Sequence, residues 1–476
     1  MSLRTSLAWT YLAQVASFLI SFASTVVIAR LVSPRDFGIL AMASAISTII
    51  AVFLGFHLAK YIMREKEVSS EVLQSVFTVN VIMTLLYVVA ILAGSFAAFR
   101  ISHSADVGRF LLVFAIFPLL AMMEFVPAAL CTRDARFGVI SILSVLRAIV
   151  MAVTTIVLAS RGFAYMSFAW AQVLAWLATS IGYNWLAWRP DAYRLRFKEI
   201  RPIITFGTQM MSVSGVAHLS TRVGEMVLGS LLGLASLGLY TRASNLTNQL
   251  HSNIYGAGSN VMFSRLSEEL RTTGRIHDTY LRFMNLMLGL LWPMMFGVAV
   301  LAQPTIHILY GAKWQAAASP LALLMIAFAI TVGIGMSAEI FILRHQTKQQ
   351  VKIEMVRSLV GLALFSGAAL ISLPAAAAAK VAEAVLAALL YRKPMARLVG
   401  GPEGDLRRMY MESSLLTGAA VLPSLVLMWH YDWSPSTPVP LIVAAVSLGI
   451  LFWAALIVSR RHPILVEASR MLRLRL

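Results

Sequence analysis

The stretch AWTYLAQVASFLISFASTVVIA, residues 8–29, decides the fold class of this chain. It contains no Asp, Glu, Lys or Arg. A helix that crosses a bilayer core about 30 Å thick requires about 20 consecutive, mostly apolar residues. The stretch is longer than the core of a signal peptide and runs into Arg30 without a clear small-x-small cleavage site. It therefore predicts a first transmembrane helix.

Comparable apolar runs recur along the whole chain. Of its 476 residues, 59% are hydrophobic and the mean hydropathy is +0.79, whereas soluble domains contain about 45–50% apolar residues. The sequence is therefore predicted to be an all-α polytopic membrane protein of about 14 transmembrane helices joined by short loops. We expect these helices near residues 8–29, 37–59, 74–98, 109–131, 139–159, 163–187, 203–232, 237–264, 282–306, 317–343, 351–373, 376–395, 411–431 and 439–459.

The net charge of +18 indicates the orientation of the chain in the membrane. Basic residues are scattered between apolar runs and not gathered in one domain, so they do not favour nucleic-acid binding. With a cytoplasmic N-terminus, most of the 39 Lys and Arg residues fall in cytoplasmic segments. The opposite side receives only Arg30, Arg35, Arg100, Arg109, Arg161 and Lys313. The positive-inside rule therefore predicts a bacterial inner-membrane protein with both termini in the cytoplasm.

Two weak internal matches indicate a duplication. At an offset of 200 residues, identical side chains align at Leu31, Gly38, Ala43 and Ser44 with Leu231, Gly238, Ala243 and Ser244. At an offset of 210, VLRAIV (145–150) meets MVRSLV (355–360), which places Arg147 on Arg357. Six helices separate the copies, so the repeats are parallel. We expect a six-helix lobe in 1–200, a second in 201–398, and two further helices with a basic cytoplasmic tail in 399–476. Transporters built from such repeats bind substrate at the repeat interface.

Five cations and five carboxylates fall inside the expected helices away from their ends, where a charge at the bilayer centre costs at least about 2.5–3.5 kcal/mol. One helical turn separates Arg222 from Glu225, so this spacing predicts a local ion pair. Arg147 and Arg242 have no carboxylate within one turn of their own helices, and are the better candidates for a functional role. An alternative for Arg147 and Arg357 is contact with lipid phosphates near the cytoplasmic helix ends. The ten are the cations Arg147, Arg222, Arg242, Arg357 and Lys380 and the carboxylates Glu124, Glu225, Glu339, Glu354 and Glu383, with Glu354–Arg357 and Lys380–Glu383 as further predicted pairs.

The expected eighth helix is rich in polar residues. Arg242, Asn245, Gln249, Ser252 and Gly256 recur at helical spacing and form a stripe with one cation. Amides and hydroxyls offer donors and acceptors to sugar hydroxyls, and arginine binds oxyanions in a fork. The stripe therefore predicts a binding surface for sugars or phosphates. The alternative is a helix held to its neighbours by polar contacts.

Other residues have simpler interpretations. Gly229 and Gly233 form a GxxxG step, which predicts close helix packing. Five tryptophans fall near expected helix ends, as membrane-interface anchors do. They are Trp185, Trp188, Trp314, Trp429 and Trp433.

No motif for catalysis or cofactor binding appears. The sequence lacks a P-loop, a dinucleotide fingerprint, HExxH, a Cys–His cluster and a nucleophile elbow. Its single cysteine, Cys131, cannot form an intrachain disulfide. We therefore predict no cofactor, no metal and no catalytic residue, and expect transport instead of enzymatic activity.

Four segments carry a family resemblance. They are RLVSPRDFGILAMASA (30–45), LGSLLGLASLGLYTRASNL (228–246), MFSRLSEEL (262–270) and WPMMFGVAVLAQPTIHILYGAKWQAA (292–317). In this order and spacing the chain resembles the polysaccharide-exporter (Wzx-type) flippases of the multidrug/oligosaccharidyl-lipid/polysaccharide exporter superfamily. The similarity covers essentially the whole chain.

The resemblance implies two six-helix lobes in a V around a cavity that opens alternately to the two sides of the membrane. The cargo would be an undecaprenyl-diphosphate-linked oligosaccharide, used for exopolysaccharide, O-antigen or capsule. Other expected partners are membrane lipids, a polysaccharide polymerase and a chain-length regulator. Glu225 would replace the aspartate that many relatives carry in helix seven for ion coupling. The candidate cargo-binding residues are Arg242, Asn245, Gln249, Ser252, Arg222, Arg147 and Arg357.

Three alternatives remain open. A multidrug or cation antiporter of the same superfamily is expected to carry unpaired carboxylates in its cavity, and the excess of arginine argues against it. A lipid II flippase is closer in mechanism, and the sequence separates it poorly. A membrane-embedded polymerase or ligase requires a substantial periplasmic loop, which the sequence does not contain.

Overall fold

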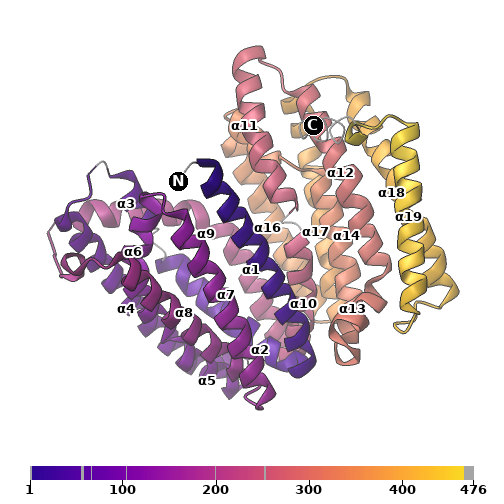
Figure 1. Ribbon diagram of the computed structural model, residues 1–476. Coiled ribbons are helices and arrows are strands. Elements are labelled where there is room, and N and C mark those ends of the chain that lie inside the picture. The colour runs from indigo at the N-terminus through magenta and orange to yellow at the C-terminus, as the bar shows by residue number, and fades with distance from the viewer. Residues whose placement is uncertain are drawn as a thin grey trace. The chain divides into compact units, whose positions relative to one another are not determined.

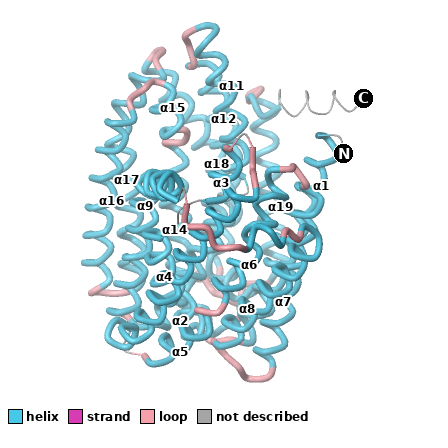
Figure 2. The backbone as a smooth tube through the Cα atoms, turned by 90° about the vertical axis from the view of Figure 1, so that its left-hand side faces the viewer, coloured by secondary structure: helices cyan, strands magenta, loops and turns pink. Residues whose placement is uncertain are grey.

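The computed structural model describes residues 3–54, 58–65, 67–102, 104–198, 200–250 and 254–465. Every regular element in these ranges is a helix (Figure 1). Figure 2 shows that short loops join the helices. Their contacts group the chain into two compact units, Met1–Gly238 and Leu239–Leu476.

The first unit is organised around a long helix, α4. This helix packs against α2, α5, α6 and α9, while α1 packs along α7 and α7 along α8. Many apolar side chains of these helices point outward, as expected of a surface in contact with lipid. The unit comprises α1 (Leu3–Leu31), α2 (Pro34–Leu54), α3 (Leu58–Arg64), α4 (Ser70–Ser102), α5 (Ala105–Phe114), α6 (Phe117–Arg133), α7 (Phe137–Ser160), α8 (Met166–Ala187), the 3₁₀ turn η1 (Pro190–Tyr193) and α9 (Ile200–Leu231).

The second unit is built from helix pairs. Here α12 packs against α14 and α18, α17 against α14 and α16, and α18 against α19. α10 begins in the first unit and continues into the second. The helices are α10 (Gly233–Leu250), α11 (Gly256–Thr273), α12 (His277–Val300), α13 (Ala302–Tyr310), the 3₁₀ turn η3 (Ala312–Ala317), α14 (Ala318–Gly333), α15 (Ser337–Leu343), α16 (Thr347–Ala369), α17 (Leu373–Val399), α18 (Glu403–His430) and α19 (Val439–Ser459).

The predicted fold class is confirmed. Helices are found at all fourteen expected segments, and ten candidate spans among the described residues are long and apolar enough to cross a membrane. The chain is therefore a multi-pass membrane protein. The expected segments 163–187, 203–232, 237–264 and 351–373 are not among these ten, so the count of fourteen crossings stays a prediction.

Several expected helices were wrongly predicted to be continuous. The segment 109–131 consists of α5 and α6, and Pro118 in the first turn of α6 explains the new start because proline favours the first helical turn. The segments 282–306 and 317–343 are also divided, into α12 and α13 and into α14 and α15. In 237–264, α10 and α11 are separate helices, and residues 251–253 between them lie outside the described ranges.

Three tyrosines satisfy backbone groups at the break between α14 and α15. Met336 has a positive φ of 60° there, and its N–H donates to the Tyr255 hydroxyl over 2.6 Å. Tyr410 donates to the Gly333 carbonyl at 2.7 Å, and Tyr280 to the Gly335 carbonyl at 3.4 Å. Within a bilayer a freed backbone group must find a protein partner, so these hydroxyls stabilise the break.

The two glycines of the predicted GxxxG step have different roles. A Cβ at Gly229 would overlap the Met42 side chain of α2, so close packing is confirmed there. Gly233 has open space around it and a φ of +82°. Its role is therefore the turn from α9 into α10, which a residue with a Cβ rarely adopts.

One predicted interface tryptophan is misplaced. Trp185, Trp188, Trp429 and Trp433 are exposed as expected. Trp314 is 0% exposed and stacks edge-on against Tyr310, with ring centroids 6.2 Å apart. Its position near a helix end could not distinguish a buried ring from an interfacial one.

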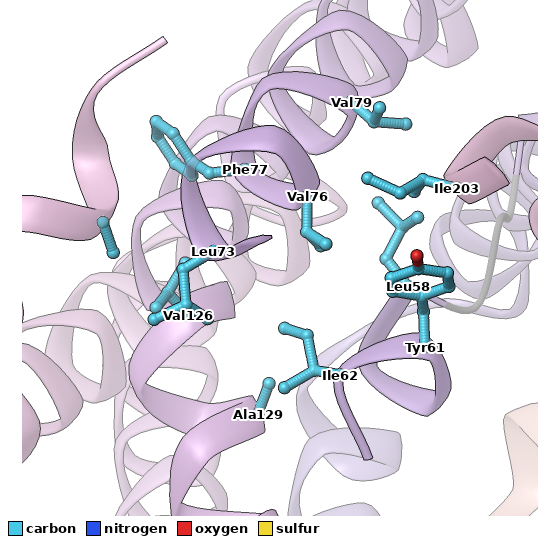
Figure 3. Packing of buried hydrophobic residues seen from close by; sticks show 11 residues of the cluster. Leu58, Tyr61, Ile62, Leu73, Val76, Phe77, Val79, Val126, Ala129 and Ile203 are labelled. Carbon is cyan, nitrogen blue, oxygen red and sulfur yellow. The ribbon is translucent and has the colours of Figure 1, made fainter. Parts of the chain in front are cut away.

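The contact grouping differs from the division expected from the repeats. α9 packs against α2, α3 and α4, so the first unit extends to Gly238 and not only to residue 200. Figure 3 shows an apolar cluster in this packing, where Val76 and Val79 of α4 lie near Ile203 of α9. The lobe boundaries at 200 and 398 stay predictions.

Candidate functional site

The predicted site residues fall in both units, and each unit is described separately. Arg147, Arg222 and Glu225 belong to the first unit. Arg242, Asn245, Gln249 and Arg357 belong to the second. Ser252 lies outside the described residues.

Arg147 of α7 sits in a polar cluster inside the first unit. Its Nη2 donates to Glu124 Oε1 of α6 at 2.5 Å and to Thr179 Oγ1 of α8 at 2.8 Å. The Thr179 hydroxyl in turn donates to Glu124 Oε2 at 2.7 Å. The guanidinium also lies 3.8 Å from the ring centroid of Trp176, a cation–π geometry.

This cluster neutralises a charge within the protein. The Glu124 side chain is only 7% exposed, so its carboxylate requires a close cation in a bundle of apolar helices. Arg147 supplies that cation and joins α6, α7 and α8. The alternative of a contact between Arg147 and lipid phosphate is therefore not needed to balance its charge.

Arg222 and Glu225 form the ion pair predicted from their spacing. Arg222 Nη1 and Glu225 Oε2 of α9 are 2.7 Å apart. Glu225 is buried, whereas the Arg222 side chain is partly exposed. Any ion that binds Glu225 must therefore compete with Arg222.

Arg242 packs against aromatic rings in the second unit. It is 5% exposed. Its guanidinium lies 4.5 Å from the ring centroid of Tyr310 and 5.7 Å from that of Trp314. Both rings come from the α13–η3 segment. In this structure Arg242 is therefore part of the packing between α10 and that segment.

The next turns of α10 present polar side chains outward. Asn245 and Asn248 are exposed and Gln249 is half-buried. Asn248 Nδ2 donates to Ser244 Oγ at 3.4 Å. The predicted stripe thus has two parts, a buried cation and a more accessible amide surface.

Arg357 belongs to a second cluster of the same type as that of Arg147. Its Nη2 lies 2.7 Å from Glu354 Oε2 on α16. The Tyr391 hydroxyl of α17 donates to Glu354 Oε1 at 2.7 Å. In both clusters an arginine, a glutamate and a hydroxyl from a neighbouring helix are joined. The two arginines are the pair aligned by the repeat.

The remaining predicted carboxylates separate into one paired and one unpaired residue. Lys380 Nζ and Glu383 Oε2 of α17 lie 2.8 Å apart, which confirms the predicted pair. Glu383 also fills the space above Gly361, where a Cβ would come 2.5 Å from its carboxyl carbon. Glu339 of α15 forms no ion pair with a residue in the described part of the chain.

Sequence reasoning missed the partners that come from other helices. Trp176 and Thr179 bind Arg147, Tyr310 packs on Arg242, and Tyr391 binds Glu354. Spacing along one helix carries no signal for such contacts. The match between Arg147 and Arg357 at an offset of 210 was the one sequence signal, because it indicated that the two arginines occupy corresponding helices.

The described residues contain no group of three or more His, Cys, Asp or Glu side chains arranged to hold a metal ion. They offer hydrogen-bonding amides and neutralised ion pairs. Such groups can bind a polar cargo.

Comparison with known families decides the assignment. Residues 27–319 match the family described as polysaccharide biosynthesis protein. The chain belongs to this family. Among its relatives is the succinoglycan biosynthesis transport protein ExoT of Rhizobium meliloti, which is 24% identical over 353 residues, covering 71% of this chain and 70% of ExoT. The lipopolysaccharide biosynthesis protein WzxC of Escherichia coli is 21% identical over 329 residues, covering 67% of this chain and 65% of WzxC.

Two solved transporter structures have a fold similar to that of this polysaccharide biosynthesis family member. The lipid II flippase MurJ in an inward closed conformation superposes with a TM-score of 0.73 at 13% identity, covering 95% of this chain and 98% of MurJ. A multidrug resistance MATE family transporter of the MOP superfamily, in an inward-facing conformation, gives 0.62 at 15% identity over 82% of this chain and 96% of the transporter. The predicted superfamily fold is confirmed.

Proposed function

We propose that this protein is a flippase that moves an undecaprenyl-diphosphate-linked oligosaccharide across the bacterial inner membrane. Its product would serve exopolysaccharide, O-antigen or capsule biosynthesis. The observation that carries the proposal is membership of the polysaccharide biosynthesis family in a chain with a polar, partly exposed α10. ExoT, named as a transport protein for succinoglycan biosynthesis, supports transport over catalysis.

The amide surface of α10 is the proposed contact for the sugars. Asn245 is exposed, so it can exchange water for sugar hydroxyls at little cost, and the half-buried Gln249 lies one turn farther along the helix. We include Ser252 by its spacing on the stripe. Arg222, partly exposed beside Glu225, is the proposed contact for the diphosphate because a guanidinium binds phosphate oxygens in a fork.

The other predicted cargo-binding arginines require a conformational change for direct contact. Arg147 and Arg357 are held by Glu124 and Glu354, and Arg242 by aromatic rings. We propose that they act on the cargo only when these contacts open. Glu225 is the proposed ion-coupling residue, since an ion on its carboxylate would release Arg222.

Orientation and partners complete the proposal. Both termini are placed in the cytoplasm because this orientation puts most of the basic residues on that side. A polysaccharide polymerase and a chain-length regulator are proposed partners, since a translocated repeat unit must be polymerised.

Two related activities and one different class are the alternatives. The fold likeness to MurJ favours a lipid II flippase, and the likeness to a MATE family transporter favours a multidrug or cation antiporter. Four of the five predicted intramembrane carboxylates, all except Glu339, are paired with cations, which argues against a cation antiporter. A polymerase or ligase is less well supported because the loops between the described helices are short.

The α10 surface can be tested by polymer export. We expect Asn245→Ala together with Gln249→Ala to reduce surface polymer while protein abundance and thermal stability stay normal, because both side chains are accessible to solvent. Ser436→Ala, in the exposed α18–α19 loop, is the matched control. Normal export by the double variant would remove the α10 surface from the proposal. A lipid-linked glycan pool that responds to depletion of the whole protein would still support translocation.

A further inference from the structure

The connection between α8 and α9 has an unusual composition for a loop. We refer to residues 188–198, WRPDAYRLRFK, as the strap. It contains four cations, three aromatic rings and a single acid. Together with Arg201 at the start of α9 it forms one of the most basic segments of the chain.

Hydrogen bonds fix the strap to the first turns of α4. The Ser70 hydroxyl donates to Asp191 Oδ2 at 2.5 Å, and Gln74 Nε2 donates to the Asp191 carbonyl at 2.8 Å. Farther along, the Ser75 hydroxyl donates to the Lys198 carbonyl at 2.9 Å, and the Arg196 N–H donates to Thr78 Oγ1 at 2.8 Å. The strap is therefore held at both ends.

Burial of its inner face adds to this attachment. Ala192 is fully buried in the same apolar cluster as Val76 and Ile203. The Tyr193 ring packs edge-on against Phe77, with centroids 5.1 Å apart, and its hydroxyl donates to Asn184 Oδ1 at 2.6 Å. Burial raises the pKa of Tyr193 to about 12, so it stays neutral. The strap therefore presents a fixed outer surface.

That outer surface is both apolar and basic. Phe197 is 65% exposed, Trp188 and Leu195 are also exposed, and Trp185 at the end of α8 is 84% exposed. The cations Arg189, Arg194, Lys198 and Arg201 are exposed, and none forms an ion pair with a described residue. Arg196 is the exception, since it pairs with Glu71 at 2.8 Å.

The single acid of the strap offsets only part of this positive charge. The hydrogen bond from Ser70 lowers the pKa of Asp191, so its carboxylate is ionised, and it faces α4. Three outward cations of the strap, together with Arg201, thus remain beside the exposed Trp188, Leu195 and Phe197. Because α4, α8 and α9 all begin or end here, the strap lies at the level where the apolar helices end.

We propose that the strap is a docking surface for anionic phospholipid headgroups. Its aromatic and leucine side chains would enter the boundary between headgroups and acyl chains, as interfacial rings do. Its three unpaired cations and the adjacent Arg201 would contact lipid phosphates, and each cation near an anionic leaflet strengthens binding by about fivefold. By the predicted orientation this leaflet is the cytoplasmic one. The proposal does not depend on which cargo the protein moves.

A local probe tests this surface on the full-length protein. A variant that combines Cys131→Ala with Phe197→Cys is labelled at its single cysteine with a small fluorophore. It is then reconstituted in phosphatidylcholine vesicles that contain a small fraction of brominated lipid. We expect brominated phosphatidylglycerol to quench the label more strongly than brominated phosphatidylcholine. A label at Thr272→Cys, on the exposed face of α11, should show no such preference.

Charge variants identify the cause. Arg189→Gln, Arg194→Gln, Lys198→Gln and Arg201→Gln together should abolish the preference, with about a fivefold loss for each cation. Replacing the three arginines by lysine should preserve it. The matched control neutralises four exposed cations elsewhere, Arg265, Arg271, Arg275 and Arg282, and should leave the preference unchanged.

Three results would overturn the proposal. One is equal quenching by the two brominated lipids in the parent protein. The second is a preference that persists after the three unpaired strap cations and Arg201 are neutralised, provided that the melting temperature is normal. The third is shielding of the label only by an added cytoplasmic extract, which would indicate a protein partner.

Discussion

Gly38 and Gly238, which the internal repeat aligns, make reciprocal contacts across two helix starts. A Cβ on Gly38 of α2 would overlap the carbonyl oxygen of Leu234, and a Cβ on Gly238 of α10 would overlap that of Pro34. Pro34 and Leu234 are themselves 200 residues apart. The starts of α2 and α10 therefore contact each other through residues that the internal repeat aligns.

We expect Gly38→Ala and Gly238→Ala each to lower the thermal midpoint of the purified protein by several degrees. The added methyl group would force the two backbones apart, and overpacking costs about 1–3 kcal/mol. Gly367→Ala in α16 is the control, since its Cβ would meet nothing within 4 Å. It should be neutral or stabilising, because alanine favours helices. Unchanged midpoints for the two contact variants would contradict the reciprocal contact.

The Arg147–Glu124 pair predicts strong coupling in a double-mutant cycle. Removing one partner leaves a buried charge alone, which costs about 3–5 kcal/mol, so Glu124→Gln and Arg147→Gln should each destabilise the protein strongly. The double variant should lose less than the sum of the single losses. Arg408→Gln tests the exposed pair with Glu412 and should have little effect. Additive losses in the buried pair would show that the two side chains act independently.

For Arg242 we expect an effect on stability as well as on transport. From the sequence alone, Arg242 is a candidate for cargo binding. The rings of Tyr310 and Trp314 change this expectation, since cation–π contacts contribute about 0.5–2 kcal/mol. Arg242→Ala should therefore lower the melting temperature, and Arg242→Lys should recover part of it. A normal melting temperature for Arg242→Ala would contradict a structural role for these cation–π contacts.

His462 predicts a dependence of stability on pH. It follows α19, is buried, and its Nδ1 accepts the N–H of Ile464 at 3.4 Å. Burial lowers its pKa below the usual 6.5, against the opposing effect of Glu412. The unfolded chain therefore binds a proton at higher pH than the folded one. This contribution to stability is complete above about pH 6.5 and falls as the pH drops through the folded pKa.

We expect the melting temperature to decrease on acidification below about pH 6.5, and His462→Phe to reduce that decrease. The slope from one histidine cannot exceed about 1.4 kcal/mol per pH unit. Comparison of the two proteins over the same buffers isolates this residue. The same acid response in both would show that other groups determine it.

Much of the fold could be predicted from the sequence because the bilayer imposes a simple rule. Apolar length marks a helix, and the local pairs Arg222–Glu225, Glu354–Arg357 and Lys380–Glu383 follow from the spacing of one turn. The sequence did not predict helix breaks at which side chains from other segments hydrogen-bond the freed backbone groups. The tyrosines at the α14–α15 break come from three separate segments, so the sequence around the break does not predict their contacts.

The candidate site was less predictable for the same reason. Arg147 lacks a carboxylate on its own helix, yet Glu124 reaches it from α6. Polar residues at helical spacing correctly marked α10 as unusual. They could not show that Arg242 is buried while Asn245 is exposed, because that difference depends on the packing of α13 and η3.

The central claim is translocation, and its most direct test is the pool of lipid-linked oligosaccharide resolved by membrane leaflet. The protein would be depleted in its native cell and restored from a plasmid. We predict that completed repeat units accumulate on the cytoplasmic leaflet during depletion, that surface polymer is lost, and that restoration reverses both. An unchanged pool in both leaflets would contradict a flippase role, and repeat units left unpolymerised on the periplasmic leaflet would indicate a polymerase instead.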